Sequence, residues 1–476
     1  MKQSIITYEN YLIFSILSLP ILLITGPFLP DFILSLSIIS FIFFVIFKKQ
    51  YFLFNDKFFF LFLVFFATCI LSSLLSDYKG KSIITSLGYL RFGILIIIIK
   101  FLINKNKNFL NLIYKLLITI FFLLFFDSVF QKIFGFNVLG FKPPYERITS
   151  FFNGDIKLGG YISRFLPLLI ALCYINKSKK ITILILLLIS TIMTILSGER
   201  TSFLMVMMFL TGFVIISDVD IKIKISIMFL PIIIFFILIS LSEVLKVRVL
   251  NTTLNQLNFL DKEPFFRTVK RSNGALQVEH RDSTIVPRVY YMYFQTSFKI
   301  FKDNSLIGSG PRTYKFKSKE KKYFTKSDHS GYLKWREIHN KKRLEETKKN
   351  NKLLEGKNNN ELKLMELGQG KYYISPKYDI WGDYPGFTNI SGANSHPHNT
   401  YLQLLSETGV IGVSIIFLIF LYCSFQILSN REIFFKCIML GIAINLFPIM
   451  FSGNFFNNWL SIIYFFPIGF LLKKIN

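Results

Sequence analysis

The residues best suited to chemistry lie in the stretch Ser395–Gly412, which joins a long polar segment to an apolar run that starts at Val410. Two of the five histidines, His396 and His398, are here. Histidine is the only side chain whose ordinary pKa lies near neutrality, so His398 is a candidate general base. The alternative is a structural histidine at a helix cap. A metal site at this pair would need a third ligand at suitable spacing, which the sequence lacks.

The residues after His398 predict a short amphipathic helix at a membrane surface, followed by a membrane-spanning helix. Asn399 is a typical N-cap residue before it, and Gly409 is a typical stop after it. Tyr401 opens the apolar face of this helix. The opposite face is polar and carries Gln403, Ser406 and Glu407.

Arg200 follows Ser197-Gly198-Glu199 and opens an apolar run at Thr201. An arginine at the end of a membrane helix can simply extend its charge toward the interface. Its planar guanidinium is also the group that grips a phosphate through two parallel hydrogen bonds. Arg200 is therefore a candidate for holding a phosphate group.

A second arginine, Arg288, precedes a segment in which Gly308 and Gly310 permit a tight turn. Such a turn can point backbone N–H groups at a phosphate, or it can be an ordinary glycine turn. Arg312 is a further cation close by.

Three other arginines have two interpretations each. Arg147 begins a segment with a Phe-Asn pair and could bind substrate or lie at the surface. Arg91 and Arg164 fall inside predicted spans, where an unpaired charge is costly, so each must pair or face a polar cavity. Asp127 is one candidate partner.

Composition indicates a membrane protein, because hydrophobic residues make up 52% of the 476 and form repeated apolar runs. The expected fold is an all-α integral membrane protein of about twelve transmembrane helices with one large periplasmic loop. The four cysteines fall in apolar runs, which argues against a disulfide framework. The net charge of +27 fits cytoplasmic loops and anionic lipid better than nucleic acid. The spans are expected near 10–26, 31–47, 57–75, 83–103, 110–130, 158–176, 181–197, 201–217, 225–244, 410–428, 434–452 and 458–472.

Basic clusters such as Lys48-Lys49 and Lys179-Lys180 fall on one side if the spans alternate. By the positive-inside rule this side is the cytoplasm, and both termini lie there. His398, Arg200 and the long loop then share the opposite face.

The chain divides into three expected parts: an N-terminal transmembrane bundle (1–244), a large periplasmic loop (245–400) and a periplasmic helix with C-terminal transmembrane helices (401–476). Within the loop, 314–370 is rich in Lys, Asn and Glu and reads as a solvated insertion. Residues 371–394 carry aromatic side chains that could stack on sugars or lie at the lipid–water interface.

The sequence His398-Asn399-Thr400-Tyr401-Leu402, followed by Glu407-Thr408-Gly409 and Gly412 ahead of a span, resembles the signature of the O-antigen ligase and polymerase superfamily. These are integral membrane glycosyltransferases of bacterial envelopes. The start of a span at Ser197-Gly198-Glu199-Arg200-Thr201 resembles the first arginine motif of that superfamily.

The second arginine motif is also present. Arg288, an aromatic residue three positions later and the segment Asn304–Pro311 resemble it. This chain has Tyr291 and Ser305 where the family often has tryptophan and proline.

The resemblance implies a metal-independent inverting glycosyltransferase in the bacterial inner membrane, with its active site facing the periplasm and no cofactor. The donor would be a polyprenyl-pyrophosphate-linked oligosaccharide, and the acceptor a lipid A–core or other glycan. His398 would deprotonate the acceptor hydroxyl while Arg200 and Arg288 hold the pyrophosphate. The expected substrate-binding residues are Arg147, Arg312, Asn399 and Tyr401.

Three alternatives stay open at this point. The motifs favour a ligase that uses lipid A–core, but a polymerase that extends another lipid-linked repeat shares them. A glycolipid flippase or transporter could line its path with the same arginines. Transporters tend to show symmetric halves, whereas this chain gathers its informative residues on one face.

Overall fold

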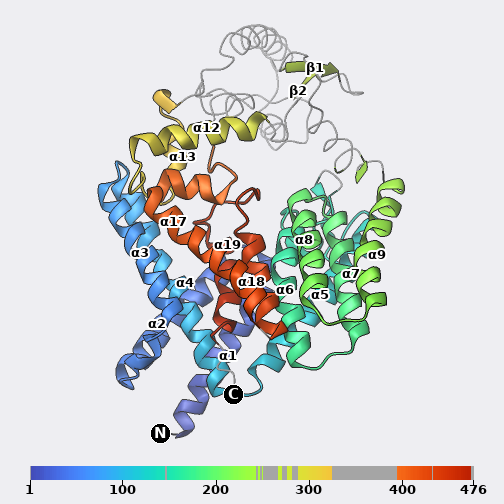
Figure 1. Cartoon of the computed structure of the whole chain (residues 1–476), viewed down its shortest axis with the longest axis horizontal. Coiled ribbons are helices and arrows are strands. Elements are labelled where there is room, and N and C mark those ends of the chain that lie inside the picture. Colours follow the sequence, from blue (N-terminus) through green and yellow to red (C-terminus); the bar gives the residue numbers. More distant parts are fainter. Residues whose placement is uncertain are drawn as a thin grey trace, which may run out of the picture.

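The computed structural model describes residues 2–144, 147–242, 245–246, 249, 266–270, 276–280, 288–323, 394–430 and 432–472. Helices dominate and run side by side in a bundle (Figure 1). The bundle helices are α1 (Lys2–Thr25), α2 (Phe28–Phe47), α3 (Lys57–Leu75), α4 (Lys79–Lys105), α5 (Phe109–Phe134), α6 (Leu158–Ile175), α7 (Lys180–Leu196), α8 (Arg200–Ile216), α9 (Ile221–Ser240), α17 (Thr400–Ser429), α18 (Ile433–Asn445) and α19 (Asn458–Phe470).

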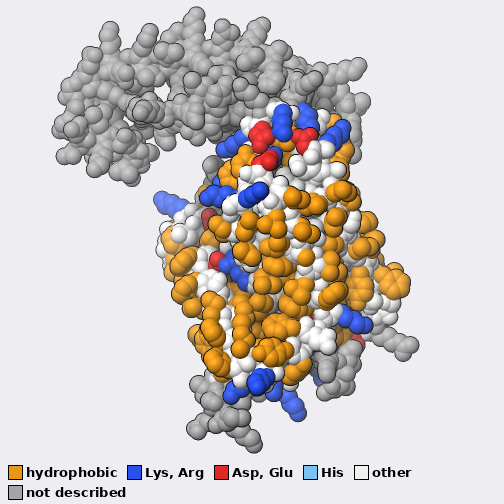
Figure 2. All heavy atoms as spheres, turned by 90° about the vertical axis from the view of Figure 1, so that its left-hand side faces the viewer, with side chains coloured by type: hydrophobic (Ala, Val, Ile, Leu, Met, Phe, Trp, Pro, Cys, Tyr) orange, Lys and Arg blue, Asp and Glu red, His pale blue; other side chains and the backbone are white. Residues whose placement is uncertain are grey.

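The outer surface of the bundle is apolar. Among the described residues, eight helices are long and apolar enough to cross a membrane, namely α1–α6, α9 and α17. The other four expected spans coincide with the shorter apolar helices α7, α8, α18 and α19. Phe14 (75%), Ile84 (73%) and Leu428 (78%) show how large side chains face outward. Figure 2 shows a band of hydrophobic side chains between two charged ends, which indicates a multi-pass membrane protein.

Polar residues set the helix ends where the sequence supplies them. Asp56 caps α3, since its carboxylate accepts hydrogen bonds from the N–H groups of Phe58 (2.9 Å) and Phe59 (3.3 Å). Gly135 ends α5 in the left-handed conformation, with φ 79°. The short 3₁₀ turns η1 (Tyr51–Phe54) and η3 (Ser150–Phe152) lie in the connections before α3 and α6.

Both termini lie at the same end of the bundle (Figure 1). The basic pairs Lys48-Lys49 and Lys179-Lys180 adjoin helix ends there, as the alternation of spans predicted. The first turns of α6, α8 and α17 lie at the opposite end, where α12 (Arg288–Asp303) packs against α17 (Figure 1). We call this the α12 end of the bundle.

The structure confirms one prediction about the C-terminal helices and corrects another. α17 is broken at Gly409 (φ 65°, ψ −167°), so a short helix before Gly409 is followed by a second helical segment that forms the span, as predicted. α18 ends at Asn445 rather than near 452, because residues 446–457 fold back across the α12 end. There Asn399 Nδ2 donates a hydrogen bond to the carbonyl of Pro448 at 2.8 Å.

The polar face of the helix after His398 is turned into the protein. Gln403, Ser406 and Glu407 are fully buried, while the apolar residues Tyr401 and Leu402 are half-exposed. This orientation differs from a helix lying on a membrane surface. It arises because Glu407 meets hydrogen-bond donors from residues far away in the sequence.

The segments above the bundle are short. β1 (Phe266–Lys270) pairs antiparallel with β2 (Leu276–His280) outside the bundle, which itself is all-helical as expected. The first residues of the expected solvated insertion form α13 (Tyr314–Lys317) and η5 (Lys321–Tyr323). They are packed rather than solvated, since Tyr314 and Lys317 are buried. The remaining insertion and the aromatic residues 371–393 lie outside the described residues.

Candidate functional site

His398 lies in the turn before α17 and has a left-handed backbone, with φ 59°. Its carbonyl accepts a hydrogen bond from the N–H of Ser452 at 2.9 Å. The next residue, Asn399, forms a bridge with Phe451. Residues 446–457 therefore hold the backbone of this turn in place.

The imidazole of His398 is half-buried among aromatic rings. Tyr293 stacks on it at 5.7 Å and Tyr290 meets it edge-on at 5.2 Å, both from α12. The ring of His396 lies 4.1 Å away. Arg288 is the first residue of α12, two positions before Tyr290. The second arginine motif and the histidine motif thus meet through α12.

The hydrogen bonds around Asn394 indicate which nitrogen of the His398 ring is unprotonated. Asn394 Oδ1 accepts from the N–H of Ser395 at 2.6 Å, so its Nδ2 is the atom that faces His398 Nε2 at 3.2 Å. Nε2 is then the unprotonated ring nitrogen, and its electron pair accepts the hydrogen bond of the Asn394 amide until a substrate hydroxyl takes that place. Burial lowers the pKa of His398 to about 4, so the ring is neutral at pH 7.

This environment predicts an unusual pH profile. A base with a pKa near 4 stays neutral well below pH 6.5, where an ordinary histidine is half protonated. We expect kcat/KM to hold down to about pH 5 and to fall tenfold per unit once the pH drops below about 4. Initial rates of glycan transfer between pH 4 and 8 test this, and an acid limb centred at about 6.5 would contradict it.

The same shift affects folding in the same pH range. Between pH 6.5 and about 4 the unfolded chain binds a proton at His398 that the folded chain does not. Stability is therefore expected to fall as the pH is lowered through this window. Acid-inactivated samples should be returned to pH 7 and re-assayed, which separates reversible protonation from loss of structure.

The side chains of Asn399 and Tyr401 are engaged within the protein. Asn399 Oδ1 accepts from the N–H of Leu402 at 3.0 Å, which confirms the predicted N-cap. Tyr401 donates its hydroxyl hydrogen bond to the carbonyl of Leu446 at 2.6 Å. These contacts fix the turn that carries His398.

The two glycine motifs interlock. Gly308 has φ 80° and Gly409 has φ 65°, and a Cβ at either would come within 2.5 Å of the other segment's backbone. The N–H of Ser309 donates to the carbonyl of Ser406 at 2.9 Å, and that of Gly310 to Glu407 at 2.8 Å. Of the two interpretations of this turn, the structure favours the ordinary glycine turn, because carbonyl groups already accept the N–H groups of Gly308, Ser309 and Gly310.

Glu407 is the buried centre of this junction. Its Oε1 accepts from the N–H of Tyr314 at 2.8 Å, and its Oε2 accepts from Gln403 Nε2 at 2.9 Å. Its carbonyl accepts from the hydroxyl of Ser72 on α3 at 2.7 Å. The sequence analysis assigned Glu407 only to the polar face of a helix. The one sequence feature that pointed to a structural role for Glu407 was its place in the motif Glu407-Thr408-Gly409.

Arg312 follows the glycine turn in a left-handed backbone conformation, with φ 63°. Its side chain is exposed at the α12 end, and Glu407 below it contributes an electrostatic interaction. Of the expected substrate-binding residues, Arg312 is the most accessible.

Arg200 begins α8 at the α12 end, after a turn in which Gly198 has φ 63°. The residue before it, Glu199, is half-buried and accepts from the first N–H groups of α6, those of Gly159 (2.8 Å) and Gly160 (3.1 Å). Burial raises the pKa of this carboxyl. Arg147, which interacts electrostatically with Glu199, donates through Nε to the carbonyl of Ser197 at 3.0 Å. These contacts form an arginine cluster around Glu199.

The membrane arginines are partnered differently from the sequence-based suggestion. Arg91 pairs with Asp31 at 2.8 Å. Asp127 instead accepts from the N–H of Val138 (2.9 Å) and the hydroxyl of Ser150 (2.6 Å). Asp127 therefore orders the connection before α6 and is not the partner of Arg91.

The structure thus forms two clusters at the α12 end. One surrounds His398 and includes the start of α12, and the other surrounds Glu199 and includes Arg147 and Arg200. The side chain of Arg288 lies outside the described residues, although its place in α12 is described. Within the described ranges, no group of three His, Cys, Asp or Glu side chains is arranged to hold a metal ion.

The comparison with known families agrees with the motifs. A family model described as O-Antigen ligase matches residues 185–340. The matched region contains Arg200, Arg288 and the Gly308–Gly310 turn, and it ends before His398. No curated protein matches the chain. This match covers about a third of the chain, and over that region the chain is similar to the O-antigen ligase family.

Proposed function

We propose that this protein is a membrane glycosyltransferase that transfers a glycan from a polyprenyl pyrophosphate to a hydroxyl of an acceptor sugar. O-antigen ligation to lipid A–core is the reaction we favour. The observation that carries this proposal is the neutral imidazole of His398, whose Nε2 is in the acceptor form beside the start of α12. The family match supports the same class of reaction.

In the proposed reaction the acceptor hydroxyl replaces the amide of Asn394 at His398 Nε2. A hydroxyl is a weak nucleophile, and loss of its proton to the imidazole raises its reactivity as the bond forms. The new bond joins the acceptor oxygen to the anomeric carbon, and the bond from that carbon to the pyrophosphate breaks. Displacement from the opposite face inverts the anomeric centre. The donor itself supplies the energy, so the proposal includes no metal or cofactor.

Arg200 and Arg288 hold the pyrophosphate leaving group in this proposal. Fixed guanidinium groups stabilise the negative charge that develops as the bond breaks. Arg312, exposed at the same end, contributes a further contact to the substrate. Arg147, Asn399 and Tyr401 act indirectly, because their hydrogen bonds within the protein keep the two clusters in shape.

Arg200→Lys should lower turnover by about tenfold or more, although the charge is kept, because an ammonium cannot form the two parallel bonds of a guanidinium. Arg288→Ala should weaken donor binding and turnover together. Both variants are tested by measuring donor binding and product formation side by side. Lys81→Arg is the control, because Lys81 is an exposed cation at the same end of the bundle. Full turnover of Arg200→Lys would argue against a bidentate grip.

We further propose that the α12 end faces the periplasm and that the termini lie in the cytoplasm of an inner-membrane protein. The basic clusters at the end that carries the termini support this orientation. Reporters fused after Lys180 or Lys224 should respond as cytoplasmic, and one inserted within 324–370 as periplasmic. A cytoplasmic response from 324–370 would remove the outer site and contradict the proposed function.

The decisive experiment uses purified protein, a lipid-linked oligosaccharide and two acceptors supplied separately. A product on lipid A–core identifies a ligase, whereas a longer lipid-linked glycan identifies a polymerase. Movement of intact donor across a vesicle bilayer, without any product, would identify a transporter and refute the transferase.

A further inference from the structure

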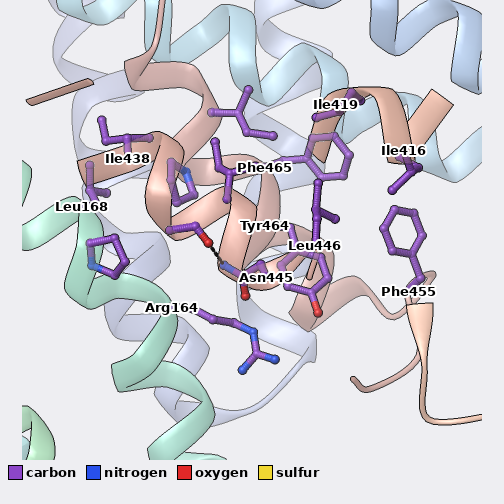
Figure 3. A pocket seen from close by; sticks show the side chains of 15 residues that line it. Arg164, Leu168, Ile416, Ile419, Ile438, Asn445, Leu446, Phe455, Tyr464 and Phe465 are labelled. Atoms are coloured by element: carbon purple, nitrogen blue, oxygen red, sulfur yellow. Dashed lines mark hydrogen bonds between the residues drawn. The ribbon is translucent and has the colours of Figure 1, made fainter. Parts of the chain in front are cut away.

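A cavity of about 70 Å³ lies among α6, α17, α18 and α19 (Figure 3). Its walls are mainly aliphatic and aromatic, with Leu168 from α6, Ile416 from α17, Ile438 from α18 and Phe465 from α19. The volume exceeds the roughly 10–15 Å³ that one water needs, yet a cavity lined by such side chains stays dry and accepts apolar ligands. Hydrocarbon is therefore its natural occupant.

One part of the lining is polar. Arg164 points its guanidinium toward the region of Asn445 and Tyr464 (Figure 3). It is 8% exposed and lies 5.7 Å from the Tyr464 ring centroid. In the described part of the chain, Nε of Arg164 and Oδ1 of Asn445 have no hydrogen-bond partner.

Arg164 also has no carboxylate oxygen within 4.0 Å among the described residues, unlike Arg91, which pairs with Asp31 at 2.8 Å. The carboxyl group of Glu199 interacts electrostatically with Arg164 without forming a direct ion pair. A buried cation without a directly paired anion is costly in a membrane protein. The cavity thus combines a dry apolar wall with a cation that no described carboxylate contacts. That combination matches an amphiphile whose hydrocarbon begins directly after an anionic group.

Contacts of Arg164 lead to the arginine cluster. Its NH1 donates to the carbonyl of Gly160 at 2.9 Å, and the N–H of Gly160 donates to Glu199 at 3.1 Å. Glu199 directly precedes Arg200. An anion held at Arg164 would therefore lie close to the arginine that we assign to the pyrophosphate.

We propose that this cavity binds the isoprene units nearest the phosphate of a polyprenyl diphosphate, and that Arg164 pairs with the phosphate attached to them. This inference rests on the proposed function, because it locates the lipid half of the same donor. Arg164 holds the inner phosphate, the cavity orients the chain, and Arg200 and Arg288 are assigned to the outer phosphate and the reacting bond.

The test uses a glycan-free polyprenyl diphosphate with a diazirine on the isoprene nearest the phosphate. Purified full-length protein is irradiated with this probe, and labelled peptides are identified by mass spectrometry. We expect labelling of α6, α18 and α19 around Leu168 and Ile438, suppressed by unlabelled polyprenyl diphosphate. Labelling confined to other helices would overturn the proposal.

Variants make the assignment specific. Arg164→Gln should reduce labelling at least tenfold, while Lys81→Gln, which removes an exposed cation at the same end, should label like the wild type. Ile438→Phe narrows the cavity without changing charge and should also reduce labelling, which provides a second test if Arg164→Gln does not fold. Wild-type labelling in folded Arg164→Gln would overturn the role of the arginine.

Two further arms separate the remaining possibilities. A phosphatidylglycerol probe should label the cavity more weakly than the polyprenyl diphosphate probe. If the two probes label it equally and compete with each other, the cavity accepts any anionic lipid, and the polyprenyl assignment is overturned. Labelling requires no turnover, so it is expected to persist in His398→Ala. Labelling without transfer by the wild type would refute only the proposed function, and transfer without cavity labelling would refute only this inference.

Discussion

Replacing His398 by alanine should reduce glycan transfer by about 10²–10⁴-fold, the usual contribution of a positioned general base. The imidazole is half-buried against Tyr290 and Tyr293, and its Nε2 accepts a hydrogen bond from Asn394 at 3.2 Å. An alanine removes the proton acceptor. Donor binding should survive, because the arginines at the α12 end remain.

His396→Ala is the matched control for this experiment. Its ring lies 4.1 Å from that of His398, so the substitution alters the same surroundings without removing the proposed base. We expect a loss of less than about tenfold. Turnover and donor binding are measured side by side, after elution in detergent has shown that each variant is folded. Full turnover in folded His398→Ala would disprove the mechanism and strengthen the transport alternative.

Gly409→Ala should destabilise the protein by about 2–5 kcal/mol or prevent its folding, the sum of backbone strain and overpacking. Gly409 has φ 65° and ψ −167°, a region that is nearly exclusive to glycine. A Cβ there would lie 2.3 Å from the carbonyl oxygen of Leu306. Either the α17 break or the turn at 305–311 must move, which would displace the His398 turn and reduce activity as well.

Gly88→Ala provides the comparison for Gly409→Ala. Gly88 lies within α4, and a Cβ there would meet no described atom within 4 Å. Alanine favours helix over glycine, so this variant should be as stable as the wild type or slightly more so. Thermal unfolding followed by size-exclusion chromatography in detergent compares the two. Equal stability of both variants would show that residues 305–311 and α17 can move apart enough to accommodate a Cβ at position 409, which would contradict the close backbone contact there.

The sequence by itself determined the membrane helices, because a backbone inside lipid must satisfy its own hydrogen bonds and long apolar runs have few alternatives to a helix. Most predicted bounds lie within a few residues of α1–α9 and α17. The types of single residues also predicted the N-cap at Asn399 and the helix break at Gly409, and the structure has both. The alternation of spans was enough to bring Arg200, Arg288 and the His398 turn to one end of the bundle.

Only the tertiary structure decided how the polar face of α17 is oriented and which partners the buried arginines have. Both depend on groups that meet only when segments distant in the sequence pack together. The hydroxyl of Ser72 reaches the carbonyl of Glu407 across 335 positions, and this junction turned the polar face of the helix inward. Helical periodicity describes a face but not what it packs against. Likewise, the rotation of the helices and their neighbours decide that Arg91 pairs with Asp31 and that no described carboxylate pairs directly with Arg164. Spacing along the chain does not contain that information.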